Sequence, residues 1–548
     1  MSATTFMPPR LLPEAIALQR ADELLNRLRA QGIVPRGVSS DSRRVQAGDL
    51  FLAYPGQHDD GRCFIADALA RGATAVLCAA DEKVGGGGTA AWFAETILDS
   101  ADGRVVPCLA VADPRALAGA LAHRIYGEPS HKLWLAGVTG TNGKTSVSQW
   151  LAQTLQRLGR RCAVIGTLGN GFPGALRDSG FTTPDAPNLQ APLAEFVAHG
   201  ATDCAMEVSS IGLAEGRVQC VAFDVAIFTN LTRDHLDYHQ TMADYAAAKA
   251  TLFATPGLDA AVLNLDDAFG MELLGALVAG KTGAAEKPRI IGYTLDAQRA
   301  RPAGIDEWLV ARELTLDGGG LRFMLDDTMI AAPLIGRFNA ANLLAVIGAL
   351  RAHGEPLATI APLLRELQAP PGRLQAIGGD IENDEPLLVV DYAHSPDALE
   401  KALETLREIA AARGGKLWCM FGCGGDRDAG KRPQMGAVAE RLADEVILTS
   451  DNPRHENPQA IVADILAGMR ATPAAHLIEL DRARAIARVV NQAAARDVIL
   501  LAGKGHETYQ EVAGVRHPFA DAEVGKSALA GRRQARSAAD STLSGGAA

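Results

Sequence analysis

Short apolar runs alternate with segments of helical periodicity along most of the chain. In the middle, apolar runs at 162–167, 203–208, 223–229 and 260–264 are typical of buried strands, and the segments between them carry apolar residues at helical spacing. The alternation begins again in the last third, with apolar runs at 387–393, 417–422, 445–450 and 497–502. Strands separated by helices predict parallel sheets that are covered on both faces.

One predicted strand-to-helix junction carries a glycine loop. An apolar run at 133–138 precedes the loop, and helical spacing of apolar residues continues after it over 145–158. The loop itself consists of Thr139, Gly140, Thr141, Asn142, Gly143, Lys144, Thr145 and Ser146. Its glycines let backbone N–H groups turn toward an anion, and the helix start adds the positive end of its dipole. Lys144 would reach the β- and γ-phosphates of a nucleotide, and Thr145 would hold Mg²⁺.

This loop departs from the standard P-loop at one position. Val138 stands where the standard motif has its first glycine, so we interpret the segment as a variant phosphate loop. The alternative interpretation is a glycine-rich turn that happens to contain a lysine.

These patterns predict an α/β protein of three domains. The first covers 1–130, with a strand at 49–54, a helix at 64–71 and a strand at 73–78. A central P-loop ATPase-type parallel sheet domain covers 131–355, including a β-rich piece at 308–325 and a helix at 339–353. A Rossmann-like doubly wound domain covers 356–533. Glycine-rich segments at 85–88 and 101–103 bracket an expected flexible insertion, and the Ala, Ser and Gly composition of 534–548 predicts a disordered tail.

Composition narrows the class of protein. The 548 residues are 48% hydrophobic and 21% charged, as in globular enzymes, and a net charge of −11 argues against a nucleic-acid partner. No apolar stretch approaches the roughly 18 residues that a membrane span needs, and the first 20 residues lack a signal-peptide core. The eight cysteines form no zinc set. We therefore expect a cytoplasmic enzyme without membrane insertion, and we expect a monomer.

More ligand-type side chains come after the next strands of the central region. Glu207 ends one apolar run, and a carboxylate at a strand's carboxyl end faces the crevice where α/β proteins bind ligands. The segment 230–239, which contains His235, comes after another apolar run and is rich in oxygen and nitrogen donors suited to Mg²⁺. A polar loop with internal hydrogen bonds is the alternative. Lys249 lies in an alanine-rich helix expected at 242–253, where a lysine is ordinarily solvated.

In order along the chain, these motifs resemble those of the Mur ligases. The resemblance covers about 39–524 and includes the glycine loop, Glu207 to Ser210, the segment 230–239 and Lys249. It continues with Gly372-Arg373, Asp391 to His394, 421–428, Asp451-Asn452-Pro453-Arg454 and Gly503 to Glu507. The glycine loop alone would indicate only the Mur and folylpolyglutamate synthase superfamily. The Asp-Asn-Pro-Arg run is more specific, because in this family it marks members that add meso-diaminopimelate rather than lysine.

The resemblance implies a reaction. An ATP-dependent ligase of this kind adds meso-2,6-diaminopimelate to the D-glutamate γ-carboxylate of UDP-N-acetylmuramoyl-L-alanyl-D-glutamate, in peptidoglycan precursor synthesis. An acyl phosphate forms first, and the amine then displaces phosphate. Such phosphoryl transfer relies on positioning and charge neutralisation, which explains the absence of an obvious Ser-His-Asp set. By resemblance Thr145, Glu207, His235 and Lys249 hold Mg²⁺, with Lys249 carbamylated to N6-carboxylysine, and Lys144, Glu207, His235 and Lys249 are the catalytic set.

The resemblance also assigns substrate contacts. ATP would be bound by the loop from Gly140 to Ser146 and by Asn342 and Arg373. Asn339 and Asn342 could instead cap a helix. The first and central domains would contact the UDP-sugar dipeptide through Ser40, Ser42, Gln57, His58, Asp59, Thr182, Thr183, Ser209, Glu215 and Arg217. Without the resemblance, any one of these serines and threonines could equally cap a turn.

The third domain would bind the amino acid. Arg427 and Arg454 could each fork to the distal carboxylate of diaminopimelate, while Asp451 and Glu507 pair with its distal ammonium. Asn452, Pro453 and Gly503 complete the expected pocket. Lysine lacks the distal carboxylate and would leave a buried arginine unpaired, so it should be rejected. An ion-pair network without a ligand is the alternative.

Three positions depart from the pattern of the relatives. Ile211 stands where His is common, Phe181 where some have Asn, and Glu215 where many have Gln. A glutamate near a diphosphate is unfavourable unless it points away or finds a cation. Two other functions stay open: a Mur-type ligase that adds a different amino acid, against which the Asp-Asn-Pro-Arg run argues, and a P-loop NTPase or kinase that is not a ligase.

Overall fold

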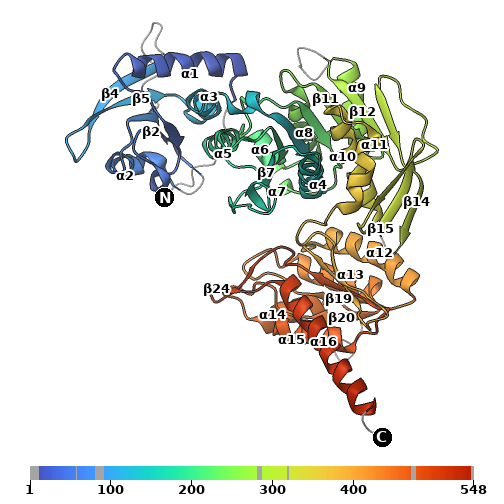
Figure 1. Ribbon diagram of the computed structural model, residues 1–548. Coiled ribbons are helices and arrows are strands. Elements are labelled where there is room, and N and C mark those ends of the chain that lie inside the picture. The colour runs from blue at the N-terminus through green and yellow to red at the C-terminus, as the bar shows by residue number, and fades with distance from the viewer. Residues whose placement is uncertain are drawn as a thin grey trace. The chain divides into compact units, whose positions relative to one another are not determined.

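The structure, a computed structural model, describes residues 11–56, 59–80, 92–280, 287–317, 320–470 and 477–544 (Figure 1). The chain forms two compact units. One consists of Met1–Val310 with Ala341–Ile360, and the other of Ala311–Ala340 with Ala361–Ala548. Among the described residues, every helix is too short or too polar to cross a membrane.

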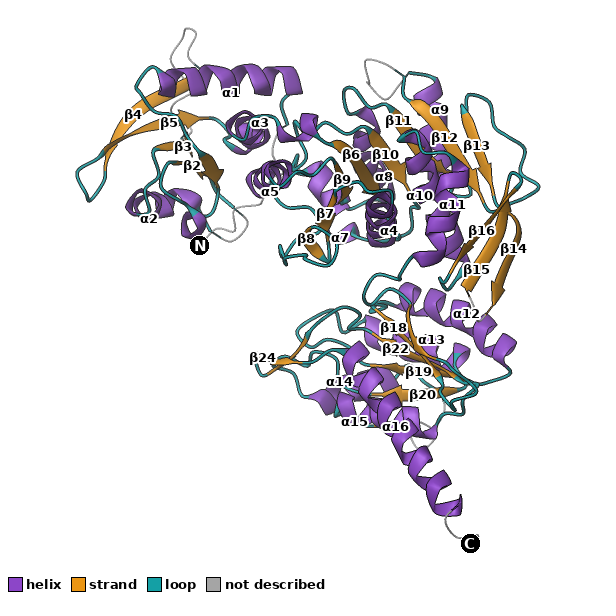
Figure 2. Ribbon diagram, in the orientation of Figure 1, coloured by secondary structure: helices purple, strands orange, loops and turns teal. Residues whose placement is uncertain are grey.

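The N-terminal part of the first unit is built on a five-stranded sheet in the order β1-β2-β3-β5-β4, parallel except for β4. Leucines and alanines of α1 and α3 pack on one face, and α2 packs on the other (Figure 2). The strands are β1 (Gly37–Ser39), β2 (Asp49–Ala53), β3 (Ala75–Ala79), β4 (Phe93–Asp99) and β5 (Val105–Val111). The helices are α1 (Glu14–Arg29), α2 (Ile65–Ala70), α3 (Arg115–Ile125) and 3₁₀ turns at Ser42–Arg44, Gly61–Phe64 and Pro129–Lys132.

An eight-stranded sheet forms the rest of the first unit, in the order β13-β12-β11-β10-β6-β9-β7-β8. It is parallel apart from β8, which pairs antiparallel with β7. Its strands are β6 (Trp134–Thr139), β7 (Cys162–Gly166), β8 (Gly169–Gly171), β9 (Asp203–Glu207), β10 (Val225–Phe228), β11 (Ala260–Asn264), β12 (Arg289–Thr294) and β13 (Glu307–Val310). Because β6 lies between β9 and β10, the segments directly after these three strands meet at one edge of the sheet.

Helices cover both faces of this sheet, as the alternating pattern predicts. Apolar side chains of α5 and α9 join one face in a single core. The helices are α4 (Lys144–Arg157), α5 (Ala186–Ala198), α6 (Ser210–Ala214), α7 (Leu236–His239), α8 (Met242–Ala250), α9 (Ala268–Val278) and a 3₁₀ turn at Thr251–Ala254. Helices α10 (Arg337–Ala352) and α11 (Leu357–Leu363) each include residues of both units, and a 3₁₀ turn at Leu364–Glu366 belongs to the second unit. The α/β prediction is confirmed, and most predicted elements agree within a few residues.

The second unit contains a small antiparallel sheet and a six-stranded sheet in the order β17-β18-β22-β19-β20-β21. In the larger sheet only β17 is antiparallel. Helices α12 to α14 pack on one face, and α15 and α16 pack on the other. This is the doubly wound arrangement that the second alternating pattern predicts.

The second unit has strands and helices with these bounds. The strands are β14 (Arg312–Asp317), β15 (Gly320–Leu325), β16 (Thr328–Ala332), β17 (Gln375–Gly378), β18 (Leu387–Asp391), β19 (Leu417–Phe421), β20 (Glu445–Leu448), β21 (Leu477–Ile478), β22 (Val498–Ala502), β23 (Tyr509–Val512) and β24 (Val515–Pro518). The helices are α12 (Pro396–Arg413), α13 (Lys431–Leu442), α14 (Pro458–Leu466), α15 (Arg482–Gln492) and α16 (Asp521–Ser544).

Two expectations about irregular segments are wrong in part. The expected insertion at 85–103 contains β4, which pairs along its whole length with β5, although 81–91 lie outside the described residues. The expected disordered tail from 534 begins inside α16, which continues to Ser544. Alanine is the strongest helix former, so an alanine-rich segment can extend a helix that is already anchored by Leu529 in the core.

Candidate active site

The predicted phosphate loop lies at the carboxyl edge of the eight-stranded sheet. It comes after β6 and leads into α4, as expected. Gly140 has a φ of 147°, and a Cβ at this position would lie 1.9 Å from Thr229 Oγ1, so a side chain is excluded here. Lys144 Nζ donates hydrogen bonds of 2.9 Å to the carbonyl oxygens of Gly140 and Thr141. The loop therefore holds a cation where a phosphate-binding lysine is expected.

Two predicted metal ligands, Thr145 in the first turn of α4 and Glu207 at the end of β9, lie together. Thr145 Oγ1 donates a 2.9 Å hydrogen bond to Glu207 Oε2, and both residues are buried. Thr167 also donates to Glu207, through its amide at 2.9 Å and its hydroxyl at 3.1 Å. A hydroxyl and a carboxylate side by side are oxygen donors of the kind that hard cations prefer, so these residues fit Mg²⁺.

Lys249 is buried rather than solvated. Only 1% of the residue is exposed, and its Nζ donates a 2.9 Å hydrogen bond to the Gly140 carbonyl, the same oxygen that Lys144 contacts. Burial, reinforced by the nearby Lys144 ammonium, lowers the pKa of Lys249 to about 6. Its amine is therefore largely neutral at pH 7.

His235 lies on the same side of the loop but is half exposed. Its ring packs edge-on against Tyr245, 6.2 Å between centroids, and the same tyrosine ring lies 4.4 Å below Lys249 Nζ. His235 Nε2 is 3.5 Å from Asp234. The structure thus gathers Lys144, Thr145, Glu207, Lys249 and, at the rim, His235.

The remaining nucleotide residues fall in both units. Asn342, in α10, lies against the loop, because a Cβ on Gly143 would be 2.5 Å from Asn342 Oδ1. Asn339 instead donates a 2.7 Å hydrogen bond to the Ile335 carbonyl. Asn142 and Ser146 belong to the loop and the first turn of α4. Arg373 belongs to the second unit, where its guanidinium lies 5.1 Å from the Tyr392 ring.

Most residues predicted to contact the UDP-sugar have protein partners. Ser40 Oγ donates to Asp185, and Thr182 Oγ1 is 3.0 Å from Thr167 Oγ1. Thr183 Oγ1 bonds the Glu207 carbonyl and the Ser209 amide, while Ser209 Oγ caps α6. Local capping, the alternative for these residues, describes Ser209 alone, because the partners of Ser40, Thr182 and Thr183 are at least 15 residues away in the sequence. Ser42 is buried and Asp59 is exposed, while Gln57 and His58 lie outside the described residues.

Glu215 finds the cation that its position requires. Arg217 binds it through Nε at 2.8 Å and through Nη2 at 2.6 Å, and donates from Nη1 to the Thr183 carbonyl at 2.7 Å. Phe181 is exposed, and its ring faces the Arg217 guanidinium at 5.6 Å. The charge of Glu215 is thus offset within the protein.

The residues predicted to bind the amino acid converge at the carboxyl edge of the six-stranded sheet. Asp451 to Arg454 come after β20, Gly503 and Glu507 after β22, and Arg427 after β19. Asp451 is only 8% exposed, and a Cβ on Gly503 would lie 2.5 Å from its Oδ2. Burial raises the pKa of Asp451, while the Arg482 guanidinium opposes the rise.

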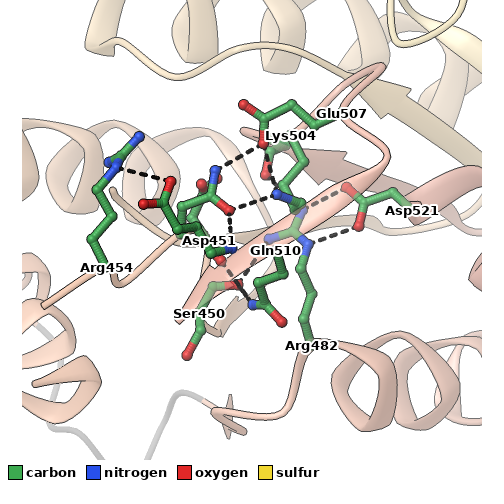
Figure 3. Close-up of polar contacts among 11 residues, drawn as sticks. Ser450, Asp451, Arg454, Arg482, Lys504, Glu507, Gln510 and Asp521 are labelled. Atoms are coloured by element: carbon green, nitrogen blue, oxygen red, sulfur yellow. Dashed lines mark hydrogen bonds and ion pairs between the residues drawn. The ribbon is translucent and has the colours of Figure 1, made fainter. Parts of the chain in front are cut away.

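The two predicted arginines differ in their surroundings. Arg454 has a φ of 51°, donates from Nη1 to the Gly425 carbonyl at 2.7 Å, and lies 3.6 Å from Glu511 (Figure 3). Arg427 donates a 3.4 Å hydrogen bond to the Asp426 carbonyl and is exposed. The Pro453 carbonyl accepts a 3.0 Å hydrogen bond from the Glu456 amide.

Sequence reasoning missed a layer of buried charge beneath these residues. Figure 3 shows Lys504 joined to Glu507, and Arg482 joined to Asp521 beside Asp451. Lys504 stands inside the motif from Gly503 to Glu507, which was a usable signal. Arg482 and Asp521 are 39 residues apart and belong to no motif, so nothing in the sequence pairs them.

Three family models match: the Mur ligase family catalytic domain at 35–126, the Mur ligase middle domain at 138–350, and the Mur ligase glutamate ligase domain at 372–505. The chain is 52% identical, over 90% of its length and 95% of the relative, to the UDP-N-acetylmuramoyl-L-alanyl-D-glutamate–2,6-diaminopimelate ligase of Pseudomonas aeruginosa.

Two further relatives carry the same description. The ligase of Neisseria meningitidis is 46% identical over 91% of this chain and 95% of its own. A solved structure of such a ligase superposes with a TM-score of 0.64 at 36% identity, over 91% of this chain and 95% of that one. Identity of this level over nearly the whole length establishes the relationship: the chain belongs to the Mur ligase family.

Proposed function

We propose that this protein is the ATP-dependent ligase that adds meso-2,6-diaminopimelate to UDP-N-acetylmuramoyl-L-alanyl-D-glutamate. The observation that carries the proposal is the amino-acid site, where Asp451, Arg454 and Glu507 lie at one sheet edge in a chain that is about half identical to ligases of that description. In the reaction, a γ-carboxylate oxygen attacks the γ-phosphorus of ATP and ADP leaves. The diaminopimelate amine then attacks the acyl phosphate, and phosphate and a proton are released.

The nucleotide half of the proposal rests on the phosphate loop. Lys144 and the loop amides would bind the β- and γ-phosphates, with Asn342 beside the loop. Thr145 and Glu207 are the proposed ligands of Mg²⁺, which when bound would offset charge on the phosphates. Arg373 of the second unit and His235 at the rim complete the proposed nucleotide and metal contacts.

Carbamylation of Lys249 is the second part of the proposal. Only a neutral amine reacts with CO₂, and the lowered pKa of about 6 keeps this amine neutral at pH 7. Lys144 and Lys249 both contact the Gly140 carbonyl, so two cations would repel each other there. Lys249 avoids this repulsion as a neutral amine, and a carbamate on Lys249 would be attracted to the Lys144 ammonium and would add an anionic oxygen ligand for a metal.

The third part concerns amino-acid choice. Asp451 and Glu507 are proposed to bind the distal ammonium, and Arg454, with Arg427, the distal carboxylate. Arg454 has one firm partner, the Gly425 carbonyl, and a 3.6 Å contact to Glu511, so its guanidinium retains donors for a carboxylate. Because lysine would leave this arginine without that partner, we propose that lysine is rejected.

We also propose a division of labour among the three predicted domains. The first domain, 1–130, would bind the UDP-sugar through Ser40 and Ser42, together with Arg217 of the central domain. The central domain, 131–355, would bind ATP, and the third domain, 356–533, would bind the amino acid. We propose that the protein works as a monomer, because one chain supplies every proposed contact. We also propose that it is cytoplasmic.

An amino-acid panel tests the function. Purified protein is given ATP, Mg²⁺ and the UDP-sugar dipeptide with meso-diaminopimelate, L-lysine or no amino acid, and phosphate release is measured. Release only with diaminopimelate is expected. Equal release without any amino acid would support an NTPase or kinase instead, and equal use of lysine would rule out the proposed pocket.

A further inference from the structure

We propose that two buried cations, Lys504 and Arg482, are positioning residues that hold the acidic side of the amino-acid site ready for the distal ammonium. This inference rests on the proposed function and extends it to residues that would not touch the substrate. Lys504 acts through Asn452 and Glu507, and Arg482 acts through the backbone of the two segments that carry Asp451 and Gly503.

Lys504 closes a three-residue hydrogen-bond set. Its side chain is fully buried, and Nζ donates to Asn452 Oδ1 at 3.0 Å and to Glu507 Oε2 at 2.7 Å. Asn452 Nδ2 donates to the same Glu507 oxygen at 2.8 Å, and Asn452 Oδ1 also accepts from the Glu511 amide at 2.9 Å. Both protein donors to Glu507 thus meet Oε2, which fixes the orientation of the carboxylate and directs Oε1 away from them (Figure 3).

Arg482 ties together the ends of two strands that are not neighbours. Its guanidinium forms a bidentate ion pair with Asp521, with Nε–Oδ1 at 2.7 Å and Nη2–Oδ2 at 2.6 Å. Both side chains are fully buried. Nη2 also donates to the carbonyl of Ala502, the last residue of β22, and Nη1 to that of Ser450, just after β20. Asp451 follows Ser450 and Gly503 follows Ala502, so one guanidinium holds the backbone of both segments.

The charges of this buried set are unequal. Lys504 and Arg482 are cations, whereas Asp451, Glu507 and Asp521 are carboxylates, and all five interact electrostatically around Asp451. Two cations thus face three carboxylates, of which Glu507 is partly exposed. Burial disfavours the charge of Asp451, so a cationic group of a ligand beside Asp451 and Glu507 would be attracted to this site. The distal ammonium of diaminopimelate is such a group.

The same contacts could serve only to stabilise the fold. A purely structural role and a positioning role for Lys504 predict different effects of a substitution on the KM for diaminopimelate. Lys504→Met keeps an unbranched side chain that is one atom shorter and removes its charge. If Lys504 positions Glu507, the variant should raise the KM for diaminopimelate by roughly 10- to 100-fold, the range that a charged hydrogen bond spans, while the KM for ATP stays within about twofold. Lys504 is one of the cations that oppose the raised pKa of Asp451, so its removal should raise that pKa further and move the acidic limb of kcat/KM for diaminopimelate to higher pH.

Two comparisons make the test specific. Lys526→Met is the matched control, because Lys526 forms the same i, i+3 pair, with Glu523 at 2.8 Å, on the exposed surface of α16. It should leave every KM unchanged. In a double-mutant cycle, Lys504→Met should add little to the defect of Glu507→Gln, since it acts through that carboxylate. Lys504→Arg, which keeps a cation, should retain part of the affinity.

The outcomes separate the two proposals. If the wild-type protein does not use diaminopimelate, the proposed function fails regardless of Lys504. If it does, but Lys504→Met leaves the KM for diaminopimelate and its pH profile unchanged, or if the two substitutions multiply fully in the cycle, the positioning role is wrong. Should Lys504→Met fold poorly by thermal unfolding, the Lys504→Arg and Arg482→Lys variants carry the same KM comparison, and unchanged values in both would overturn the inference.

Discussion

At the scale of single residues, the lysines of the phosphate loop act through charge. Lys144 Nζ lies between two loop carbonyls, where a γ-phosphate would give it a stronger partner. Lys144→Ala should fold normally and lower kcat by two orders of magnitude or more, because charge is removed from the transferring phosphoryl group. Steady-state kinetics with Lys132→Ala, an exposed lysine, as control would measure this, and near-normal turnover would remove Lys144 from the site.

Lys249 offers a chemical rescue experiment. Lys249→Ala should be nearly inactive, because the proposed carbamate is lost, and short carboxylates such as acetate should restore part of the activity by filling the vacated space. Activity is measured against acetate concentration, with Lys144→Ala as the comparison that acetate should not restore. Full activity of Lys249→Ala without acetate would exclude the metal-binding role.

Arg454 should govern selectivity. Arg454→Ala is expected to raise the KM for diaminopimelate roughly 10- to 150-fold, corresponding to about 1.5–3 kcal/mol for a charged hydrogen-bonded pair, with little change for ATP. The discrimination against lysine should shrink, since the cost of an unpaired arginine disappears. Arg484→Ala, an exposed arginine of the same unit, is the control. An unchanged KM in Arg454→Ala would contradict the assignment.

At the scale of elements, the ends of neighbouring strands set the metal site. Gly166 ends β7, and a Cβ there would lie 2.2 Å from Glu207 Oε1 at the end of β9. Gly166→Ala should therefore displace the Glu207 carboxylate, increase the Mg²⁺ concentration needed for half-maximal activity, and destabilise the fold by about 1–3 kcal/mol through overpacking.

Gly275 in α9 supplies the contrast, because a Cβ there meets nothing within 4 Å. Gly275→Ala should leave the Mg²⁺ dependence unchanged and stabilise the protein by up to about 1 kcal/mol, the helix propensity difference. Magnesium titrations and thermal unfolding of both variants check the pair. Equal Mg²⁺ dependence in the two variants would mean that the Glu207 carboxylate does not bind the metal.

At the scale of the whole molecule, the proposed substrates are divided between the two compact units: the phosphate loop belongs to one and the amino-acid site to the other. Amide formation requires the acyl phosphate and the amine to come within bonding distance, so we expect ligands to change the arrangement of the units. Small-angle scattering with and without an ATP analogue and both substrates measures this. Identical dimensions in all states would argue against a closing motion.

The sequence by itself determined the α/β class, most strands within a few residues, and the residues of the phosphate loop. It could do so because apolar runs of strand length and helical spacing reflect burial directly, and because the loops at the carboxyl ends of parallel strands lie along a common edge. The resemblance to the Mur ligases predicts that Thr145 and Glu207 share a metal, and the two side chains are in contact although 62 residues separate them.

Only the tertiary structure decided which polar groups are buried and which partners they contact. Lys249 reads as a surface residue in an alanine-rich helix, yet it is almost fully buried beside a second lysine. Lys504 and Arg482 meet partners 52 and 39 residues away. The periodicity of apolar residues indicates which apolar side chains are buried. It does not indicate which charged side chains are buried, because a buried charge needs a partner, and that partner comes from an element distant in the sequence. The negative charge of Glu215 is likewise offset by an ion pair with Arg217 that the tertiary structure shows.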